Sequence, residues 1–275
     1  MICAIVVVFN PEGNFESCLA SYCNSVDRVI VVDNSPLCNA DRVSKVVNCT
    51  YLSLGGNQGI AKALNVGCEV ACQLGGSAVL LMDQDSKFLP GGADALLGVY
   101  RDMSCEPSLA IVAPFRLDQV ETKEGYKDRV ITSGTVMKLG VYKEEGCFQE
   151  NLFIDEVDFE YCYRLRRRGY KIFQTHLSVL QHRVGEPISV RIKGRTVKSM
   201  GHGYTRKYYI YRNRLIVRKQ YPEFTERYLR SCFFDFFKMI RLERDRIRKS
   251  YFILKGIVHY FIGRTGKLLV KNQDD

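Results

Sequence analysis

Two aspartates separated by one residue, Asp83 and Asp85, are the side chains in this sequence with the clearest capacity for chemistry. They follow an apolar run at residues 78–82, which has the length and composition of a buried parallel strand. Open α/β sheets bind ligands at the carboxyl ends of their strands, where paired carboxylates can hold Mg²⁺ or Mn²⁺ with a substrate phosphate. Taken alone, the pattern is more often a polar turn or a helix cap, so other motifs must decide.

A second acidic cluster occupies residues 155–160, where four of six residues are carboxylates. If Asp155 caps a helix, Asp158 falls at the capping-box position. Side chains at positions 158 and 160 then point about 200° apart, and Glu160 is spaced to pair with Arg164. Asp158 is therefore the carboxylate that we expect to face a site. A carboxylate that only stabilises the helix dipole fits the spacing equally well.

Two basic residues are weaker candidates. His182 follows an apolar strand pattern, where packed or capping histidines are common, and only a pairing with Asp85 makes it a candidate metal ligand. Arg212 could contact a diphosphate through two nitrogens, and a charged helix face is an equal alternative. The glycines of residues 55–59 lack the spacing of a dinucleotide-binding loop, and residues 263–268 lack the upstream glycine of a P-loop.

The elements that must position these side chains alternate along the first hundred residues. We expect strands at residues 2–9, 28–33, 49–54, 77–82, 109–115 and 130–139, and helices at residues 15–22, 58–74 and 155–168. Such alternation predicts an α/β fold with a mostly parallel sheet flanked by helices. A shift in composition near residue 185 predicts a nucleotide-binding core at residues 1–185 and a basic, mostly helical C-terminal appendage at residues 186–275.

Composition suits a core of this kind, since 46% of the 275 residues are hydrophobic. The eleven cysteines include no C-x-x-C pair, and their odd number and scatter favour a reducing compartment. No run of 18 apolar residues predicts a membrane span, and no basic leader precedes the N-terminal apolar run. We therefore expect a cytoplasmic protein, and the sequence leaves its oligomeric state open.

The formal net charge of +10 is concentrated in the C-terminal part, where residues 187–222 hold ten Lys or Arg and no Asp or Glu. Such a field attracts nucleic acid, anionic lipid or diphosphates. A nucleic-acid-binding module would not need the aspartates at positions 33, 83, 85 and 158. We therefore expect no nucleic-acid partner. In the basic, aromatic tail from Tyr221 we expect most aromatic side chains to pack on the core, and we favour partial contact of the tail with an anionic membrane surface.

Short segments extend these observations over residues 1–215. They lie at residues 6–11, 31–35, 56–65, 82–86, 133–135, 153–160, 164–165, 169–170, 180–185 and 208–213. Together they resemble the family-2 glycosyltransferases of the GT-A fold, and more narrowly the bacterial rhamnosyltransferases of that family. The most specific are Asp-Gln-Asp-Ser at 83–86 and Ile-Asp-Glu-Val-Asp-Phe-Glu at 154–160.

The resemblance implies a nucleotide-sugar donor, with dTDP-L-rhamnose favoured and a UDP-linked hexose as the alternative. It implies Mg²⁺ or Mn²⁺ held by Asp85 and His182, and Asp158 as the catalytic base. The implied donor-binding residues are Asn10, Pro11, Asp33, Asn34, Asn57, Gly59, Asn65, Asp83, Gln84 and Arg212, with Asp33 accepting a hydrogen bond from the base. Glu156 departs from the family pattern and would add a charge near the acceptor.

The implied reaction suits these groups. Cleavage of a sugar–diphosphate bond places negative charge on the leaving phosphate, which a cation at Asp85 can neutralise. Asp158 could take the proton of the acceptor hydroxyl, and a single base without a nucleophile predicts inversion at the anomeric carbon. We expect Asp85 and Asp158 to share a cavity, and the acceptor to be a glycan or lipid-linked glycan of bacterial surface polysaccharide synthesis. A catalytically inactive scaffold of the same fold is the remaining hypothesis.

Overall fold

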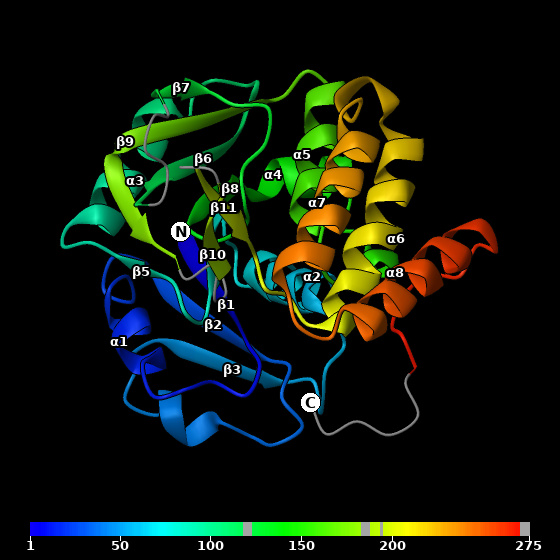
Figure 1. The fold of residues 1–275 in the computed structure, drawn as a ribbon. Coiled ribbons are helices and arrows are strands. Elements are labelled where there is room, and N and C mark those ends of the chain that lie inside the picture. Colours follow the sequence, from blue (N-terminus) through cyan, green and yellow to red (C-terminus); the bar gives the residue numbers. More distant parts are fainter. Residues whose placement is uncertain (118–122, 183–187, 193–194, 270–275) are drawn as a thin grey trace. The chain divides into compact units, whose positions relative to one another are not determined.

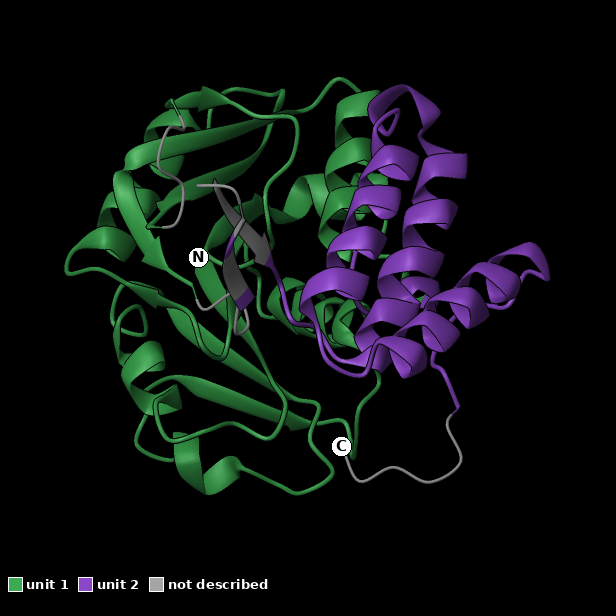
Figure 2. Ribbon diagram, viewed as in Figure 1, with its two compact units in different colours: residues 1–150, 157–183 green, residues 151–156, 184–275 purple. Residues whose placement is uncertain are grey.

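The computed structural model describes the chain except residues 118–122, 183–187, 193–194 and 270–275. It divides into two compact units (Figure 2): residues 1–150 with 157–183, and residues 151–156 with 184–275. The short segment 151–156 thus belongs with the C-terminal residues although it interrupts the first unit in sequence. No single boundary expresses this division, and the boundary predicted at residue 185 lies outside the described residues.

The first unit is built on a mixed sheet, which has nine strands within the described residues (Figure 1). Its order is β3-β2-β1-β4-β8-β6-β9-β5, and β7 also pairs with β9. The strands are β1 Ile2–Val8, β2 Arg28–Asp33, β3 Cys49–Ser53, β4 Ala78–Asp83, β5 Lys87–Phe88, β6 Leu109–Arg116, β7 Gly125–Tyr126, β8 Thr135–Lys138 and β9 Lys171–Gln181. Strands β3, β2, β1 and β4 are parallel, so their carboxyl ends share one edge. The predicted α/β class is confirmed.

The helices of this unit are α1 Phe15–Ala20, α2 Ile60–Gln73, α3 Gly92–Met103, α4 Leu139–Glu145 and α5 Val157–Arg167, with the short 3-10 turn η1 Ala40–Val43. A second 3-10 turn, η2 Glu150–Leu152, begins at the last residue of segment 1–150 and continues into segment 151–156. Helix α5 starts two residues later than predicted, because Asp155 and Glu156 have φ values of 61° and 66°, which a right-handed helix does not allow. The strand predicted at residues 130–139 begins only at Thr135. Gly134 before it has φ 81°, and a Cβ there would lie 2.8 Å from Pro114 Cγ.

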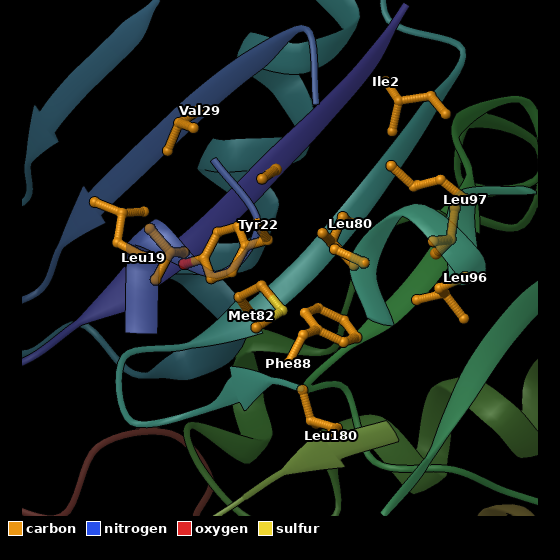
Figure 3. Close-up of a cluster of buried hydrophobic side chains, with 14 of the residues drawn as sticks. Ile2, Leu19, Tyr22, Val29, Leu80, Met82, Phe88, Leu96, Leu97 and Leu180 are labelled. Atoms are coloured by element: carbon orange, nitrogen blue, oxygen red, sulfur yellow. The ribbon is translucent and has the colours of Figure 1, made fainter. Parts of the chain in front are cut away.

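The apolar runs are continuous because both faces of the central strands are buried. On one face of β1, Ala4 and Val6 join a hydrophobic cluster that includes Leu80 and Met82 of β4 and side chains of α3 (Figure 3). On the other face, Ile5 packs against Gly67 of α2, where a Cβ would come within 2.4 Å of Ile5 Cγ2. A rigid sheet of this kind fixes the strand ends that carry Asp33 and Asp83.

The second unit is mostly helical, with a β10–β11 hairpin at its start (Figure 1). Its elements are β10 Ile188–Ile192, β11 Arg195–Ser199, α6 Tyr204–Gln220, η3 Pro222–Phe224, α7 Tyr228–Leu242 and α8 Arg246–Phe261. Helices α6 and α8 approach closely at Gly256, where a Cβ would lie 2.6 Å from the Tyr208 carbonyl oxygen. Among the helices of the described residues, none has the length and apolarity needed to cross a membrane.

Candidate active site

Three candidate metal ligands gather where β4 and β9 end. Asp83 is the last residue of β4, Asp85 lies two residues further on, and His182 directly follows β9. One ligand atom of each side chain lies within 4.8 Å of the other two, and all three side chains are partly exposed. The antiparallel pairing of Lys87 with Gln181 brings the two chain segments together. Carboxylate oxygens with one imidazole suit Mg²⁺ or Mn²⁺.

Two serines that were not predicted as site residues, Ser86 and Ser133, form hydrogen bonds to the candidate metal ligands. The Ser86 hydroxyl is 2.7 Å from His182 Nδ1, and the Ser133 hydroxyl donates to Ser86 Oγ at 2.7 Å. The backbone N–H of Asp83 donates to Ser133 Oγ at 3.3 Å. Both serines are buried. Hydrogen bonds of this kind fix the orientation of a ligating histidine. Both serines lie in segments 82–86 and 133–135, which resemble the family, and this resemblance could have marked them as site residues.

Gln84 and Asn10 join the turns that follow β4, β1 and β2. The Gln84 side chain accepts the Phe9 N–H at 2.7 Å and donates to the Phe9 carbonyl at 3.1 Å. The Asn10 N–H donates to Ser35 Oγ at 2.7 Å. Asn10 adopts φ 44°, an uncommon conformation for a residue other than glycine. Backbone strain of this type concentrates at functional turns.

Asp33 lies beneath the loop that follows β2 and has no exposed surface. Its carboxylate accepts the Ser35 N–H at 2.8 Å, the Asn39 side-chain amide at 2.9 Å and the Tyr51 hydroxyl. Burial raises the pKa of Asp33, but the hydrogen bonds lower this pKa by more than burial raises it. The pKa therefore lies below its ordinary value. The carboxylate therefore shapes the loop. Its contact with a nucleobase is still a prediction.

Asn34, Asn57 and Gly59, which were assigned to the donor pocket, do come together. Asn34 donates to the Gly59 carbonyl at 3.2 Å and accepts the Gln58 N–H at 2.8 Å, while Asn57 accepts the Gly59 N–H at 3.0 Å. Pro11 lies in the turn after β1, and its carbonyl accepts from the Arg42 guanidinium. The turns after β1, β2, β3 and β4 thus form one connected edge.

Asn65 and Arg212 do not have the surroundings expected of donor ligands. Asn65 is buried in α2, where it donates to the Phe148 carbonyl at 3.0 Å and accepts the Phe148 N–H at 2.9 Å. Arg212 is fully buried in the second unit and donates to the carbonyls of Gly266 at 2.8 Å and Leu152 at 3.1 Å. In this structure both side chains hold distant chain segments together, and their contact with a donor stays a prediction.

Asp158 lies half-buried at the start of α5, and its Oδ1 accepts the Phe159 N–H at 2.9 Å. It lines a cavity of about 10 Å³, room for roughly one water. Asp85 lines a different cavity of about 520 Å³. Asp85 and Asp158 thus line different cavities among the described residues, and a cavity shared by both stays a prediction. Thr135 lines the Asp158 cavity, while Ser133, two residues before it, hydrogen-bonds to Ser86.

A third cavity of about 320 Å³ is cationic. Among the described residues, its lining includes Arg116, Lys127 and Arg129 together with Ser133 and Phe159, and no carboxylate. The Arg129 guanidinium lies 4.4 Å from the centre of the Phe159 ring. Ser133 lines this cavity and also hydrogen-bonds to Ser86 beside the metal-ligand group, so the serine links the two.

The remaining acids of the second cluster have structural partners. The predicted pair of Glu160 with Arg164 is confirmed, with 2.6 Å between Oε2 and Nη2. Glu156 is buried in the second unit, where it accepts from Arg214 at 3.2 Å and from the Tyr228 hydroxyl at 2.7 Å. The charge of Glu156 is paired with that of Arg214, and its place near the acceptor stays a prediction.

Asp155 was expected only to cap a helix. Its φ of 61° is unusual, and it pairs with Arg206 at 3.2 Å. Burial raises the pKa of Asp155 above its ordinary value despite the opposing effect of Arg206. The nearby His202 has its pKa lowered to about 4, first by burial and then by Arg206 and Lys207. A strained carboxylate with a raised pKa is a candidate proton acceptor that spacing did not reveal.

Comparison with known proteins matches residues 3–167 to the model of glycosyl transferase family 2. A curated relative described as dTDP-rhamnosyl transferase RfbF, from Shigella flexneri, is 28% identical over 246 residues, covering 80% of this chain and 81% of the relative.

Among solved structures, GalNAc-T7 with UDP, GalNAc and Mn²⁺ has a TM-score of 0.58 at 12% identity over 80% of this chain. The match spans 47% of the GalNAc-T7 chain. S. aureus TarS residues 1–349 in complex with UDP-GlcNAc has a TM-score of 0.52 at 14% identity, covering 95% of this chain and 72% of that one. At these identities the likeness concerns the fold.

Proposed function

Because the chain belongs to glycosyl transferase family 2, we propose that it transfers a sugar from a nucleotide-sugar donor to an acceptor hydroxyl, with inversion and with Mg²⁺ or Mn²⁺. The observation that carries the proposal is the group of Asp83, Asp85 and His182 within 4.8 Å at the carboxyl end of β4. A divalent cation held by these residues would supply positive charge where the leaving diphosphate becomes more negative.

The donor that we propose is dTDP-L-rhamnose, with a UDP-linked sugar as the alternative. The similarity to a protein described as a dTDP-rhamnosyl transferase supports the first. The second is supported only by structures whose titles name UDP or UDP-GlcNAc, and these share the fold at low identity. Asn10, Asn34 and Asn57 stand at the connected turns and would contact the nucleotide. Asp33 would act by shaping its loop.

Asp158 is the proposed base for the acceptor hydroxyl, and Asp155 is the competing candidate because burial raises its pKa. The cationic cavity beside Phe159 supports an acceptor that carries a negative group. A lipid-linked glycan has such a group in the phosphate of its lipid carrier. We therefore propose a glycan or lipid-linked glycan acceptor, as in bacterial surface polysaccharide synthesis, and no nucleic-acid partner.

Hydrolysis of dTDP-L-rhamnose, with water in place of the acceptor, tests the proposal without knowledge of the acceptor. The release of dTDP measures the rate. We expect Asp85→Asn to lower the Mn²⁺-dependent rate at least 100-fold and to weaken donor binding measured by calorimetry. We expect Asp158→Asn to lower the rate by about 10²–10⁴-fold while donor binding is retained. Asp128→Asn is the matched control, because the Asp128 side chain is 81% exposed and pairs only at the surface with Arg166.

The outcomes separate the alternatives. A larger rate loss in Asp155→Asn than in Asp158→Asn would transfer the role of base to Asp155. Binding of UDP-sugars without binding of dTDP-rhamnose would change the donor. Full activity of Asp85→Asn in the presence of a chelator would refute the cation site.

A further inference from the structure

Helix α8 carries an apolar stripe that faces away from its own unit. Ile247, Tyr251, Leu254, Val258 and Phe261 are 46–89% exposed. Their spacings of four, three, four and three residues place them within about 80° of one another at 100° per residue. The exposed face of a helix in a globular protein is normally polar. A continuous stripe of large apolar side chains on this face therefore calls for a partner.

The opposite face of α8 is already used. Phe252, Ile253 and Gly256 are buried, and Gly256 packs against the α6 backbone at Tyr208. Helix α8 is thus apolar on two faces, of which one packs within the unit. The exposed stripe is a separate surface with no role in that packing.

Helix α7 has a similar exposed face. Leu229, Phe233, Phe234 and Phe237 are 46–60% exposed, and the rings of Phe233 and Phe237 lie 4.6 Å apart. The inner side of α7 contributes Met239 to a buried cluster. Two consecutive helices therefore present large apolar and aromatic side chains to the surroundings.

Basic residues border both stripes. They are Arg230 and Arg241 on α7 and Arg246, Arg248 and Lys255 on α8. Helix α8 contains no Asp or Glu, and the one carboxylate of α7, Asp235, pairs with Arg214 at 2.8 Å. A partner complementary to these helices would have both an apolar part and negatively charged groups. A second copy of the chain would set like charges against each other, and nucleic acid would leave the apolar side chains in water.

We propose that the exposed faces of α7 and α8 form a docking surface for an anionic lipid bilayer. The apolar side chains enter the boundary between head groups and acyl chains, and the basic residues contact lipid phosphates. The inference deepens the proposed function, since a lipid-linked acceptor would be met at this surface, but the docking itself does not require transferase activity.

Co-flotation of the full chain with vesicles tests the surface. We expect binding to vesicles of phosphatidylcholine with phosphatidylglycerol, and much weaker binding to phosphatidylcholine alone. The Leu254→Ser/Phe261→Ser double variant should bind at least tenfold more weakly. The Arg230→Gln/Arg246→Gln variant should lose about fivefold per charge, from about 1 kcal/mol for each basic residue, and should be less sensitive to salt.

The matched control is Val47→Ser/Leu177→Ser, which removes two exposed apolar side chains of the first unit and should bind like the unchanged protein. Thermal unfolding confirms that each variant is folded. Release of dTDP in vesicle-free buffer should be equal in all of them, so that failure of docking is distinguishable from failure of the proposed function. The proposal is overturned if no vesicle binds, if neutral and anionic vesicles bind equally, or if sedimentation shows dimers that only Leu254→Ser/Phe261→Ser dissociates.

Discussion

The Ser86 hydroxyl determines the orientation of a residue that could bind a metal. It lies 2.7 Å from His182 Nδ1 and is itself hydrogen-bonded by Ser133, and both serines are buried. The same ring nitrogen lies 3.9 Å from Asp83 Oδ2, so the hydroxyl holds the imidazole beside the candidate metal ligands. A buried hydroxyl can therefore act on the site through another side chain.

We predict that Ser86→Ala weakens Mn²⁺ binding by about 10–100-fold, the usual effect of removing the hydrogen-bond partner of a ligating histidine. Calorimetric titration of the protein with Mn²⁺ measures the change. Ser44→Ala, which removes an exposed hydroxyl bonded to Asp41, should leave the affinity unchanged. An unaltered Mn²⁺ affinity in folded Ser86→Ala would mean that the serine does not orient the histidine.

At the scale of elements, a single carboxylate joins four segments of the second unit. Glu243 follows the last residue of α7 and is buried. It accepts from Lys207 of α6 at 3.0 Å, from Lys249 of α8 at 2.7 Å and from Ser199 of β11 at 2.5 Å. Burial raises the pKa of Glu243, but these bonds lower it below the ordinary value. The charge is therefore stabilised by the fold.

We predict that Glu243→Gln costs about 3–5 kcal/mol of unfolding free energy at pH 7, because two buried lysines lose their counter-ion. A depressed pKa contributes stability that is full above the unfolded value of about 4.3 and is lost as the pH falls through the folded value. The difference between variant and unchanged protein should therefore shrink below about pH 4. Urea unfolding from pH 3 to pH 8 measures it.

Exposed Glu226 provides the control, and Glu226→Gln should change the unfolding free energy by less than about 0.5 kcal/mol. A pH-independent difference for Glu243→Gln would indicate that the carboxylate is not ionised in the folded chain.

At the scale of the whole molecule, the candidate metal ligands lie at the edge of a sheet that is stabilised by its buried apolar strands and not by an ion. The apolar strands β1, β2 and β4 are buried on both faces, whereas Asp83, Asp85 and His182 are partly exposed. An ion at this edge would contribute to ligand binding far more than to folding.

We predict that a chelator leaves the thermal midpoint of the ligand-free protein nearly unchanged but abolishes the shift produced by dTDP-rhamnose. At a donor concentration of 100 times Kd, binding contributes about 2.7 kcal/mol, or a shift of roughly 5–11 °C at 2–4 °C per kcal/mol. Thermal unfolding with Mn²⁺, and with Mn²⁺ plus excess chelator, makes the comparison. Collapse of the ligand-free midpoint on chelation would show instead that the ion is structural.

Strands β1, β2 and β4 could be predicted from residue types alone, because a strand buried on both faces is apolar almost throughout. The sequence also marked the polar residues after those strands, since parallel strands end at one edge. Spacing alone places Asp155 and Glu156 in a helix, but both have positive φ values. Their partners Asn213 and Arg214 lie 58 positions away in the sequence.

Long-range contacts determine which polar side chains remain available to a ligand. Arg212, Asn65 and Glu156 have the residue types of a binding site, but long-range partners bury each of them. Likewise, nothing local could show that Ser133 reaches Ser86 across 47 positions. Residue type and spacing fix what a side chain is able to do. Burial and hydrogen-bond partners depend on segments far apart in the chain, and these decide whether it can meet a ligand.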